Sequence, residues 1–416
     1  MLLSKPASCD LNMRISRVTR NAKLAVFLVI IVNVMILIML TSSEILSGSE
    51  NTYEEETIEL NTESYGEGFC VAFNMTKAKN SFRQDGLEPI SLAVHSTSHF
   101  VREIEDQCAS WNWNGPISLA LYVDSFSYEY VQYMYDLHRC STKVQEKMNI
   151  HIVYKKAPFQ EDCSPIRIDS SNISCTEFMA KRTKRIGQMV NSFGIYPINV
   201  MRNVARKGAA SDIHMLADAE MFFSQGFAYK MKKLANDYIN GKDKNVLVIR
   251  RFEAKTKADF PKDYNDLFDK FKGQQVFEFH HKFFPLGHTI EGLWFWFRET
   301  RNNAKTPIAW PIPYKSSSWE AQLIQHRNDP YNPEYFPSRI RDQQTLVYEH
   351  CRANYTFLLA SHGFNIHKGI KTSESNLAAA VVTHQKKLRY RSHVRFNQYL
   401  NETYPDTFDQ CGRFIM

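Results

Sequence analysis

The residues best suited to chemistry are two carboxylates, Asp218 and Glu220, which directly follow an apolar run at residues 213–217. Such a run predicts a short buried strand, and a bend after the strand lets both carboxylates reach one ion. Hard divalent cations bind carboxylate oxygens, and Mn2+ also accepts an imidazole nitrogen. The spacing therefore predicts a metal site at Asp218 and Glu220. Two solvated carboxylates in a turn are the alternative.

His367 is the expected third metal ligand. It ends a second apolar stretch, residues 355–366, and Gly369 permits a close approach of the backbone to a ligand. Lys368 and Lys371 carry positive charge that can neutralise phosphate. We predict that His367 binds the metal and that both lysines contact a bound phosphate. A purely structural histidine is the alternative.

A proton acceptor is expected near the metal. Asp342 follows a proline-rich stretch and begins an apparent helix, and its carboxylate can deprotonate a hydroxyl group as a general base. The alternative is that Asp342 stabilises the helix N-terminus electrostatically. Glu253 and Glu320 are alternative acids for the same task. Three tryptophans can stack on a substrate ring or fill the core, namely Trp294, Trp296 and Trp319.

Two arginines, Arg202 and Arg206, lie four residues apart in a stretch whose pattern predicts a helix over 199–207. Residues at this spacing lie on the same face of a helix. Together they can bind a diphosphate or a carboxylate of a ligand. A charged face turned to solvent is the alternative.

Alternating strands and helices must hold these residues. Apolar runs predict strands at residues 116–124, 149–154, 213–217 and 245–249, and periodic patterns predict helices at 127–139 and 199–207. This order predicts an α/β fold with a Rossmann-like sheet that binds ligands at the carboxyl ends of its strands. The aromatic and proline-rich region 280–340 is expected to form loops and short strands around a cleft.

The composition fits a folded protein with a small-molecule substrate. The chain has 416 residues, of which 44% are hydrophobic and 13% aromatic, enough for a sizeable core in one large domain or two smaller ones. The net charge of +7 is mild for this length. It does not require nucleic acid, which we do not expect as a partner, and it suits an anionic small substrate.

A membrane anchor is predicted near the N-terminus. Residues 24–41 are apolar apart from Asn33 and the hydroxyl residue Thr41, with basic residues before them and glutamates after them. The positive-inside rule then predicts a cytosolic tail at 1–23 and a type II orientation. The acidic residues 42–68 are predicted to form a solvated stem, and residues 69–416 are predicted to form the lumenal domain. A cleaved signal peptide is the alternative. The short span suits the thin membranes of the early secretory pathway and favours the Golgi.

The cysteines and glycosylation motifs agree with a lumenal domain. Of the 8 cysteines, only Cys9 precedes the span, and the scattered spacing of the others predicts disulfides rather than a zinc site. Cys163 with Cys175 is the most local candidate pair, and the odd number beyond the span leaves one thiol unpaired or bonded between chains. Acceptor motifs for N-glycosylation occur at Asn74, Asn172, Asn354 and Asn401.

The sequence resembles glycosyltransferase family 49, which includes the dystroglycan-type β-1,4-glucuronyltransferase and LARGE-like enzymes. The resemblance runs from about Cys70 to His367. It rests on ordered blocks, namely residues 113–118, 196–206, 218–224, 251–253 and 319–320, together with His367. The block 196–206 is long and specific. Where the family usually has a second aspartate in its acidic triplet, this chain has Glu220.

The resemblance implies a GT-A fold, a UDP-sugar donor and a Mn2+ ion held by the acidic triplet and a late histidine. We therefore expect a type II Golgi enzyme that transfers a sugar, with glucuronic acid a candidate, to a glycan or glycoprotein acceptor. Members studied as glucuronyltransferases invert the anomeric centre. Asp124, after the first strand, is expected to contact uridine or ribose, and Arg202 the diphosphate.

Two alternatives remain at this point. Glu220 favours a catalytically inert homologue that binds glycans or a partner protein. A transferase that retains the anomeric configuration is the other hypothesis. The sequence leaves open whether the protein forms homo- or hetero-oligomers.

Overall fold

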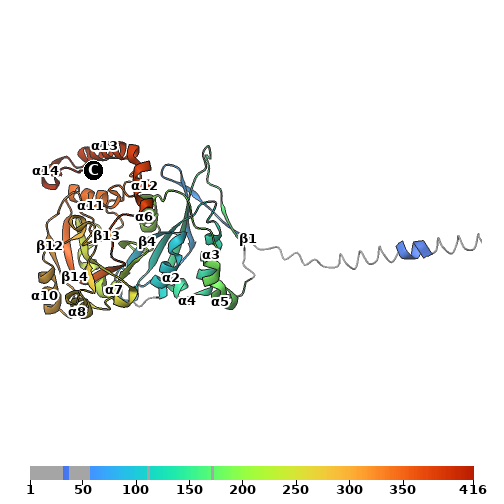
Figure 1. The fold of residues 1–416 in the computed structure, drawn as a ribbon, viewed down its shortest axis with the longest axis horizontal. Helices are drawn as coiled ribbons and strands as arrows, with labels where there is room; N and C mark the ends of the chain where they lie inside the picture. The colour runs from blue at the N-terminus through green and yellow to red at the C-terminus, as the bar shows by residue number, and fades with distance from the viewer. Residues whose placement is uncertain (1–30, 37–56, 110–112, 170–172) are drawn as a thin grey trace, which may run out of the picture. The chain divides into compact units, whose positions relative to one another are not determined.

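The computed structural model describes residues 31–36, 57–109, 113–169 and 173–416 (Figure 1). The chain divides into two units, residues 1–56 and 57–416. In the first unit, residues 31–36 are helical. The rest of the predicted span 24–41, the tail, Cys9, Asn172 and most of the stem lie outside the described residues. No helix in the described part of the chain combines the length and the hydropathy needed to cross a membrane.

The second unit is built on a 12-stranded mixed sheet and a separate two-stranded sheet. The strands are β1 (Thr57–Leu60), β2 (Glu63–Tyr65), β3 (Phe69–Thr76), β4 (Ile90–Thr97), β5 (Ile117–Tyr122), β6 (Met148–Lys155), β7 (Ile166–Asp169), β8 (Ile213–Asp218), β9 (Met221–Phe223), β10 (Asn245–Ala254), β11 (Val276–Glu278), β12 (Ala309–Ile312), β13 (Gln322–His326) and β14 (Thr356–Lys368). The order in the large sheet is β12-β14-β10-β13-β8-β4-β5-β6-β3-β2, with β11 beside β10 and β9 beside β14.

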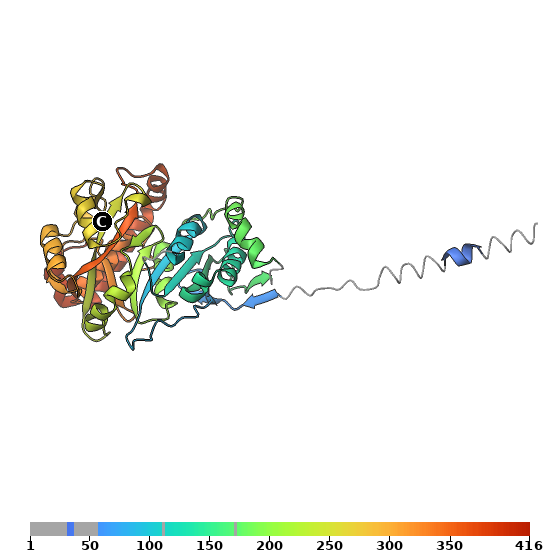
Figure 2. The same cartoon turned by 90° about the horizontal axis from the view of Figure 1, so that it is seen from below.

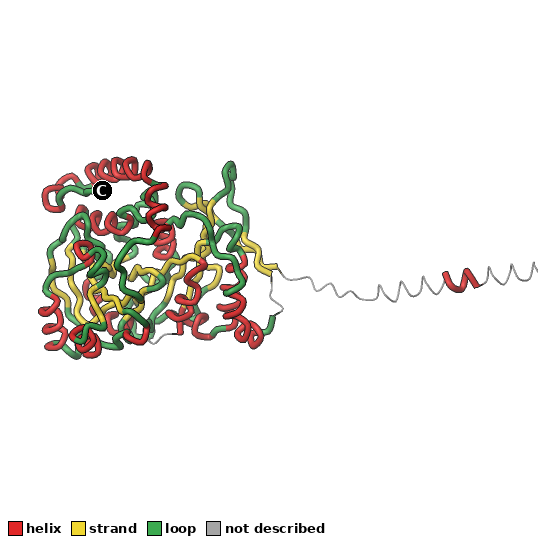
Figure 3. The backbone as a smooth tube through the Cα atoms, in the orientation of Figure 1, coloured by secondary structure: helices red, strands yellow, loops and turns green. Residues whose placement is uncertain are grey.

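Helices lie on both faces of the large sheet (Figure 3). They are α2 (Val101–Ala109), α3 (Glu129–Cys140), α4 (Thr142–Lys147), α5 (Cys175–Ile186), α6 (Ile198–Lys207), α7 (Phe227–Tyr238), α8 (Tyr264–Lys272), α9 (Pro285–His288), α10 (Leu293–Asn302), α11 (Asp342–Arg352), α12 (Asn376–His384), α13 (Lys386–Thr403) and α14 (Phe408–Cys411), with short 3-10 turns at η1 (Ser98–Phe100), η2 (Lys257–Asp259) and η3 (Pro405–Thr407).

The central strands run parallel, and this sets the position of the site. β4 pairs in parallel with β5 and with β8, and β10 pairs in parallel with β14. β13 is antiparallel to both β8 and β10, so β8 and β10 point the same way. β4 and β5 are buried along almost their whole length, as expected for parallel strands covered on both faces. The carboxyl ends of β4, β8, β10 and β14 therefore meet at one edge.

Three apolar cores join the helices to the sheet. One lies under α6 and includes Val200, Val204 and Leu346 of α11, while a larger one on the other face includes residues of α2, α3 and α7. The third gathers residues of β10 and β14 with those of α10, α11 and α13, which belong to the C-terminal half of the chain (Figure 2).

Most expected elements are confirmed. The strands predicted at 116–124, 149–154, 213–217 and 245–249 correspond to β5, β6, β8 and β10, and the predicted helices correspond to α3 and α6. The mixed α/β architecture with a large central sheet is likewise confirmed.

The expectation for residues 280–340 is wrong in part, because α10 is a ten-residue helix inside this region. Its aromatic run has modest helix propensity, which hid the helix from the sequence pattern. Burial of Trp296 and Phe297 stabilises it, and Gly292 at φ 71° supplies the left-handed residue before its first turn.

The folded unit also begins earlier than residue 69. β1 pairs with β7, and β2 pairs with β3, although both strands fall inside the range expected to be stem. The glutamates of these strands remain largely exposed, which explains why the segment resembled a solvated spacer.

Disulfides are present, but the predicted pair Cys163–Cys175 is wrong. The bonds join Cys70 to Cys163, Cys140 to Cys175, and Cys351 to Cys411. Proximity in sequence favoured Cys163 with Cys175, whereas the fold places Cys163 beside β3 and Cys175 at the start of α5 against α3. The side chain of Cys108 lies outside the described residues.

Candidate functional site

Asp218 is the last residue of β8, and the neighbouring strand fixes its surroundings. His95 of β4 is its partner in the parallel ladder, so the two side chains lie on the same side of the sheet. Nε2 of His95 is 3.1 Å from Oδ1 of Asp218, and Nδ1 of His95 is 2.8 Å from the hydroxyl of Tyr196. Tyr196 thus orients the imidazole that faces the carboxylate. Sequence reasoning missed His95, because a single histidine in an apolar strand carries no signal.

The carboxyl group of Asp218 is held in its ionised form. Loss of surrounding water raises the pKa of this carboxyl, but the hydrogen bond from His95 and the charges of His95, Arg202 and Arg251 outweigh that effect and hold the pKa below its usual value. The side chain stays partly exposed. Asp218 is therefore an accessible anion at physiological pH.

Glu220 and His367 meet although they are far apart in sequence. Asp218 ends β8 and Glu220 lies in the turn before β9, and β9 pairs with β14 so that Met221 lies opposite His367. This pairing brings Nε2 of His367 to 3.9 Å from Oε1 of Glu220. The predicted ligands Asp218, Glu220 and His367 thus share one edge of the sheet.

The donor chemistry of these three residues fits a divalent ion, but they do not form a finished cage. Two carboxylates and an imidazole are a donor set that Mn2+ accepts. However, no group of three or more His, Cys, Asp or Glu in the described part of the chain is arranged to hold a metal. Glu220 and His367 fit as a pair, while Asp218 turns its Oδ1 to His95 and Arg202. The metal role therefore stays a prediction.

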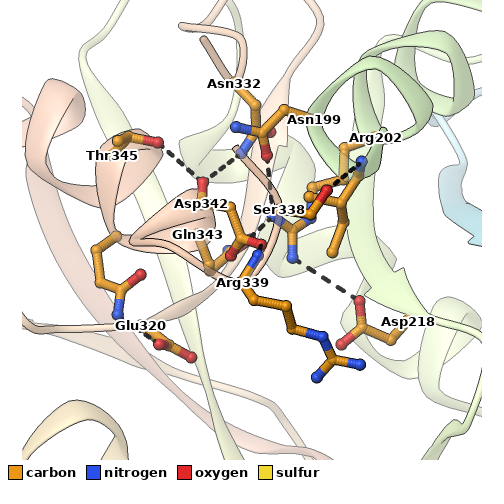
Figure 4. Close-up of polar contacts among 12 residues, drawn as sticks. Asn199, Arg202, Asp218, Glu320, Asn332, Ser338, Arg339, Asp342, Gln343 and Thr345 are labelled. Carbon is orange, nitrogen blue, oxygen red and sulfur yellow. Dashed lines mark hydrogen bonds and ion pairs between the residues drawn. The ribbon is translucent and has the colours of Figure 1, made fainter. Parts of the chain in front are cut away.

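Arg202 joins two carboxylates of the site (Figure 4). It lies on α6 and is 5% exposed. Its Nη2 is 3.9 Å from Oδ1 of Asp218, its Nη1 is 3.5 Å from Oδ1 of Asp342, and Nη1 also donates to Oδ1 of Asn199 at 3.0 Å. Arg202 therefore balances protein charges, and its predicted contact with a diphosphate stays a prediction.

Asp342 is engaged by the protein on both oxygens. It is the first residue of α11, as the sequence indicated, and its Oδ2 accepts a hydrogen bond from the backbone N–H of Arg339 at 3.0 Å. Its other oxygen faces Arg202. These contacts hold the carboxylate in place and stabilise the loop before the helix. They leave Asp342 less available as a base than the sequence indicated.

Glu320 has surroundings suited to proton transfer. Its Oε1 accepts from Nε2 of Gln344 at 2.6 Å, and Nε2 of His288 is 3.4 Å from its Oε2. Burial, followed by the negative charges of Asp342 and Asp218, raises the pKa of Glu320 to about 7, although nearby arginines oppose this. A carboxyl that titrates near neutral pH is suited to proton transfer.

Two further arginines face the site. Arg251 on β10 lies 4.0 Å over the ring of Phe279, and its buried Nε has no hydrogen-bond partner among the described residues. Arg339 is exposed, and its side chain extends into the space drawn between Asp218 and Glu320 (Figure 4). Both cations are suited to binding an anionic ligand.

The loop that carries Arg339 is strained. Arg339 and Arg341 have φ angles of 68° and 55°, in the left-handed region that non-glycine residues rarely adopt. The hydroxyl of Ser338 donates to the backbone carbonyl of Tyr196, and Arg341 Nη1 donates to Oγ of Ser318 at 3.1 Å. Such strain persists where the surroundings impose it, and it clusters at functional sites. No sequence pattern would have revealed it.

The other predicted site residues have mixed surroundings. Asp124 accepts hydrogen bonds from Phe193 N–H at 2.6 Å and Gly194 N–H at 3.1 Å and so holds a loop. Lys371 pairs with Glu374 at 3.1 Å, whereas Lys368 is exposed. Ligand contacts of these residues stay predictions.

The structure also shows where the alternative acid Glu253 and the three tryptophans lie. Glu253 is fully buried, and its Oε1 is 2.7 Å from Nδ1 of His281, so it lies away from open solvent. Trp296 and Trp319 belong to the core, while Trp294 is exposed.

Comparison with known proteins identifies the family. The family described as glycosyl-transferase for dystroglycan matches residues 89–405, which is most of the chain. The protein belongs to this family, and it is a glycosyltransferase. This outcome favours the enzyme over the inert alternative.

Curated relatives agree with this assignment. Beta-1,4-glucuronyltransferase 1 of Danio rerio is 22% identical over 358 residues, covering 82% of this chain and 81% of the relative. Xylosyl- and glucuronyltransferase LARGE1 of Danio rerio is 22% identical over 262 residues, covering 62% of this chain and 28% of the relative.

Solved structures resemble the chain only distantly. S. aureus TarS in complex with UDP-GlcNAc has a TM-score of 0.35 at 10% identity, covering 77% of this chain and 74% of that chain. GalNAc-T7 with UDP, GalNAc and Mn2+ has a TM-score of 0.34 at 9% identity, covering 80% and 56%. A likeness at this level carries no conclusion about the ligands of this protein.

Proposed function

We propose that the protein transfers a sugar from a UDP-sugar to a hydroxyl of a glycan or glycoprotein acceptor, on a GT-A type fold, with glucuronic acid the first candidate donor sugar. The observation that carries the proposal is the meeting of Glu220 and His367, 3.9 Å apart, beside Asp218 at the carboxyl edge of the sheet. In open α/β sheets this edge is where ligands bind. The names of the curated relatives, a glucuronyltransferase and a xylosyl- and glucuronyltransferase, support the donor class.

In this proposal Asp218, Glu220 and His367 hold a Mn2+ ion, which when bound supplies a Lewis acid for the diphosphate leaving group. Arg251 and Arg339 bind anionic groups of the donor. Both are cations without a carboxylate partner within ion-pair distance among the described residues, whereas Arg202 is already balanced by Asp218 and Asp342.

Glu320 is our preferred base for the acceptor hydroxyl, with Asp342 second. The pKa of Glu320 is raised to about 7, so its carboxylate can take a proton near neutral pH. His288 and Gln344 orient its two oxygens. A single base acting on the acceptor corresponds to inversion at the anomeric carbon. The configuration of the product tests this against the retaining alternative.

The proposal places the enzyme in the Golgi membrane as a single-pass type II protein anchored through residues 24–41, with residues 57–416 in the lumen. Three disulfides support an oxidising compartment. The exposed acceptor asparagines Asn354 and Asn401 are compatible with lumenal glycosylation.

The first test is a donor screen of the purified protein that measures released UDP with and without Mn2+. UDP-glucuronic acid, UDP-xylose and UDP-N-acetylglucosamine are the donors to compare. We expect release from at least one donor, dependent on Mn2+. Asp218→Asn should lower release by about 1000-fold, because it weakens the stabilisation of the leaving group.

The matched control is Asp237→Asn, which changes an exposed carboxylate paired with Lys233 on α7. It should release UDP at the wild-type rate. Equal activity of Asp218→Asn and Asp237→Asn, in proteins with the same melting temperature, would contradict the metal assignment.

A further inference from the structure

A cavity of about 530 Å³ lies away from the carboxyl edge of the sheet. Its lining includes Lys244, which directly precedes β10, and Tyr355, which directly precedes β14. Because β10 and β14 are parallel, these residues mark the amino ends of the strands whose carboxyl ends carry Arg251 and His367. The cavity is therefore a separate feature from the candidate transfer site. Its size falls within the range of ligand pockets, roughly 300–1,000 Å³.

Tyrosines and two buried carboxylates characterise the cavity. The tyrosines are Tyr331, Tyr335, Tyr355, Tyr399 and Tyr404. Asp329 and Glu349 line the same space and are each 4% exposed. Oδ1 of Asp329 accepts from the hydroxyl of Tyr355 at 2.8 Å, and Oε1 of Glu349 accepts from the hydroxyl of Tyr399 at 2.8 Å. Each carboxylate is thus held in place by a hydrogen bond from the hydroxyl of a tyrosine in the cavity wall.

The protonation of the carboxylates matches a polar, neutral ligand. Burial raises the pKa of Glu349 to about 7 and also raises the pKa of Asp329. Oε2 of Glu349 has no hydrogen-bond partner among the described residues, so it remains able to bond a ligand hydroxyl in either protonation state.

Positive groups also lie at this cavity. Lys244 and Arg395 line the cavity, and the guanidinium of Arg395 lies 4.1 Å from the ring centre of Tyr335. Arg206 lies behind the wall, 4.0 Å from the ring centre of Tyr331. Tyrosine cages can bind quaternary ammonium groups, but the positive charges of Lys244 and Arg206 oppose a cationic ligand here. Flat aromatic faces with hydrogen-bonding groups at their rims instead match the apolar faces and hydroxyls of a sugar ring.

We propose that this tyrosine cavity binds a sugar residue of a carbohydrate, at a second site distinct from the site of transfer. α11 connects the two regions, because Asp342 begins the helix at the transfer site and Glu349 lies seven residues later in the cavity wall. At the rise of an α-helix this separation is about 10 Å along the axis. One helix therefore links the two regions, although they lie at opposite ends of β10 and β14. The proposal goes beyond the transfer reaction, since binding here requires neither donor nor metal.

The test is saturation-transfer NMR on the full-length protein without nucleotide. The probes are methyl β-xylopyranoside, methyl β-galactopyranoside and methyl N-acetyl-β-glucosaminide, each at millimolar concentration. At least one should bind the wild type. Tyr399→Ala removes a ring at the rim and should weaken binding about tenfold, the equivalent of one good aromatic contact. Glu349→Gln keeps the shape of the wall and should also weaken binding.

Tyr390→Ala is the matched control, because Tyr390 lies on the same helix, α13, and is 73% exposed outside the cavity. It should bind the probes like the wild type. Tyr399→Phe separates stacking from hydrogen bonding, since it keeps the ring and loses the hydroxyl that bonds Glu349 and Tyr404. The same variants should release UDP from the donor at the wild-type rate, which keeps this result independent of the donor screen.

Three outcomes overturn the proposal. In the first, no probe binds the wild type. In the second, a probe binds wild type, Tyr399→Ala and Glu349→Gln equally, which places it elsewhere. In the third, choline binds and is displaced by none of the sugars, which makes the cavity a cation site.

Discussion

Arg202 and Arg206 differ in role although they lie one turn apart on α6. Arg202 faces the carboxylates Asp218 and Asp342. Arg206 is fully buried and donates to the backbone carbonyls of Pro330 at 2.6 Å, His326 at 3.0 Å and Asp329 at 3.3 Å. α6 therefore contributes Arg202 to the charged site and Arg206 to the rigid scaffold.

The difference lies in the partners rather than in the arginines. Side-chain carboxylates can also bind a metal or accept a proton, so the contacts of Arg202 belong to a reactive region. Backbone carbonyls do not act as proton acceptors at neutral pH, and the contacts of Arg206 instead fix the segment 326–330, part of which lines the tyrosine cavity. The same contrast holds for acids. Asp218, beside His95 and arginines, has a lowered pKa, while Glu349 in the cavity wall has a pKa raised to about 7.

Arg206→Ala should have the largest effect on stability and tests the scaffold role of this arginine most directly. The change leaves three backbone carbonyls without their charged donor, and hydrogen bonds to charged groups contribute about 1.5–3 kcal/mol each, with incomplete additivity. We expect the free energy of unfolding to fall by about 4 kcal/mol. Urea unfolding monitored by circular dichroism measures the loss. A decrease below about 1 kcal/mol would contradict a scaffold role.

Glu320→Gln should have the next largest effect, on activity. The variant keeps the shape of the side chain but cannot accept a proton, so transfer should fall by about 100- to 1000-fold. In the wild type, the raised pKa of Glu320, about 7, predicts that kcat/KM rises with pH through about 7 and then levels off, because only the deprotonated carboxylate acts as a base. Glu320→Gln should lose this rise.

Asp342→Asn provides the contrast for that measurement. If Asp342 were the base, Asp342→Asn would lose most of the transfer activity and Glu320→Gln would keep both its activity and the profile of the wild type. A pH profile of transfer by both variants therefore decides between the two carboxylates.

Arg202→Leu should have a smaller effect, about 100-fold on transfer, because the ionised forms of Asp218 and Asp342 lose a shared positive charge. The measured quantity is kcat/KM for the donor. The matched control is Arg206→Lys, which keeps the charge in the scaffold position and should change transfer far less than it changes stability. Equal losses of transfer in both variants would remove the distinction between the two arginines.

The sequence predicted the framework of the site because apolar runs carry a clear signal. β8 was recognised from such a run, with Asp218 at its end, and His367 was expected beside it as the third metal ligand after a second apolar stretch. The structure adds the pairing of β9 with β14, which brings Glu220 to His367.

Features that depend on long-range packing were not predictable. The raised pKa of Glu320 requires its burial and the charges of distant residues. The disulfides join segments that only the fold brings together. The ladder position of His95 depends on the register of β4 with β8, which no local pattern specifies. The tyrosine cavity likewise draws its residues from four separate segments.

The smallest expected effect tests whether the strained loop serves the reactive region. Arg339 has φ 68°, and a glycine adopts this conformation without a steric penalty. Arg339→Gly should therefore raise the free energy of unfolding by up to about 1 kcal/mol. If Arg339 binds an anionic group of the donor, the same variant should raise KM for the donor about tenfold, equivalent to about 1.4 kcal/mol.

A gain of stability together with a loss of donor affinity is the outcome that a purely structural arginine does not produce. Arg389→Ala, which changes an exposed arginine on α13, should alter neither quantity. Arg339→Lys keeps the charge and most of the strain, so it should retain more donor affinity than Arg339→Gly while remaining as stable as the wild type. If Arg339→Gly has the KM of the wild type, the strain at this position belongs to the scaffold, and the charged region then ends at Arg202 and Arg251.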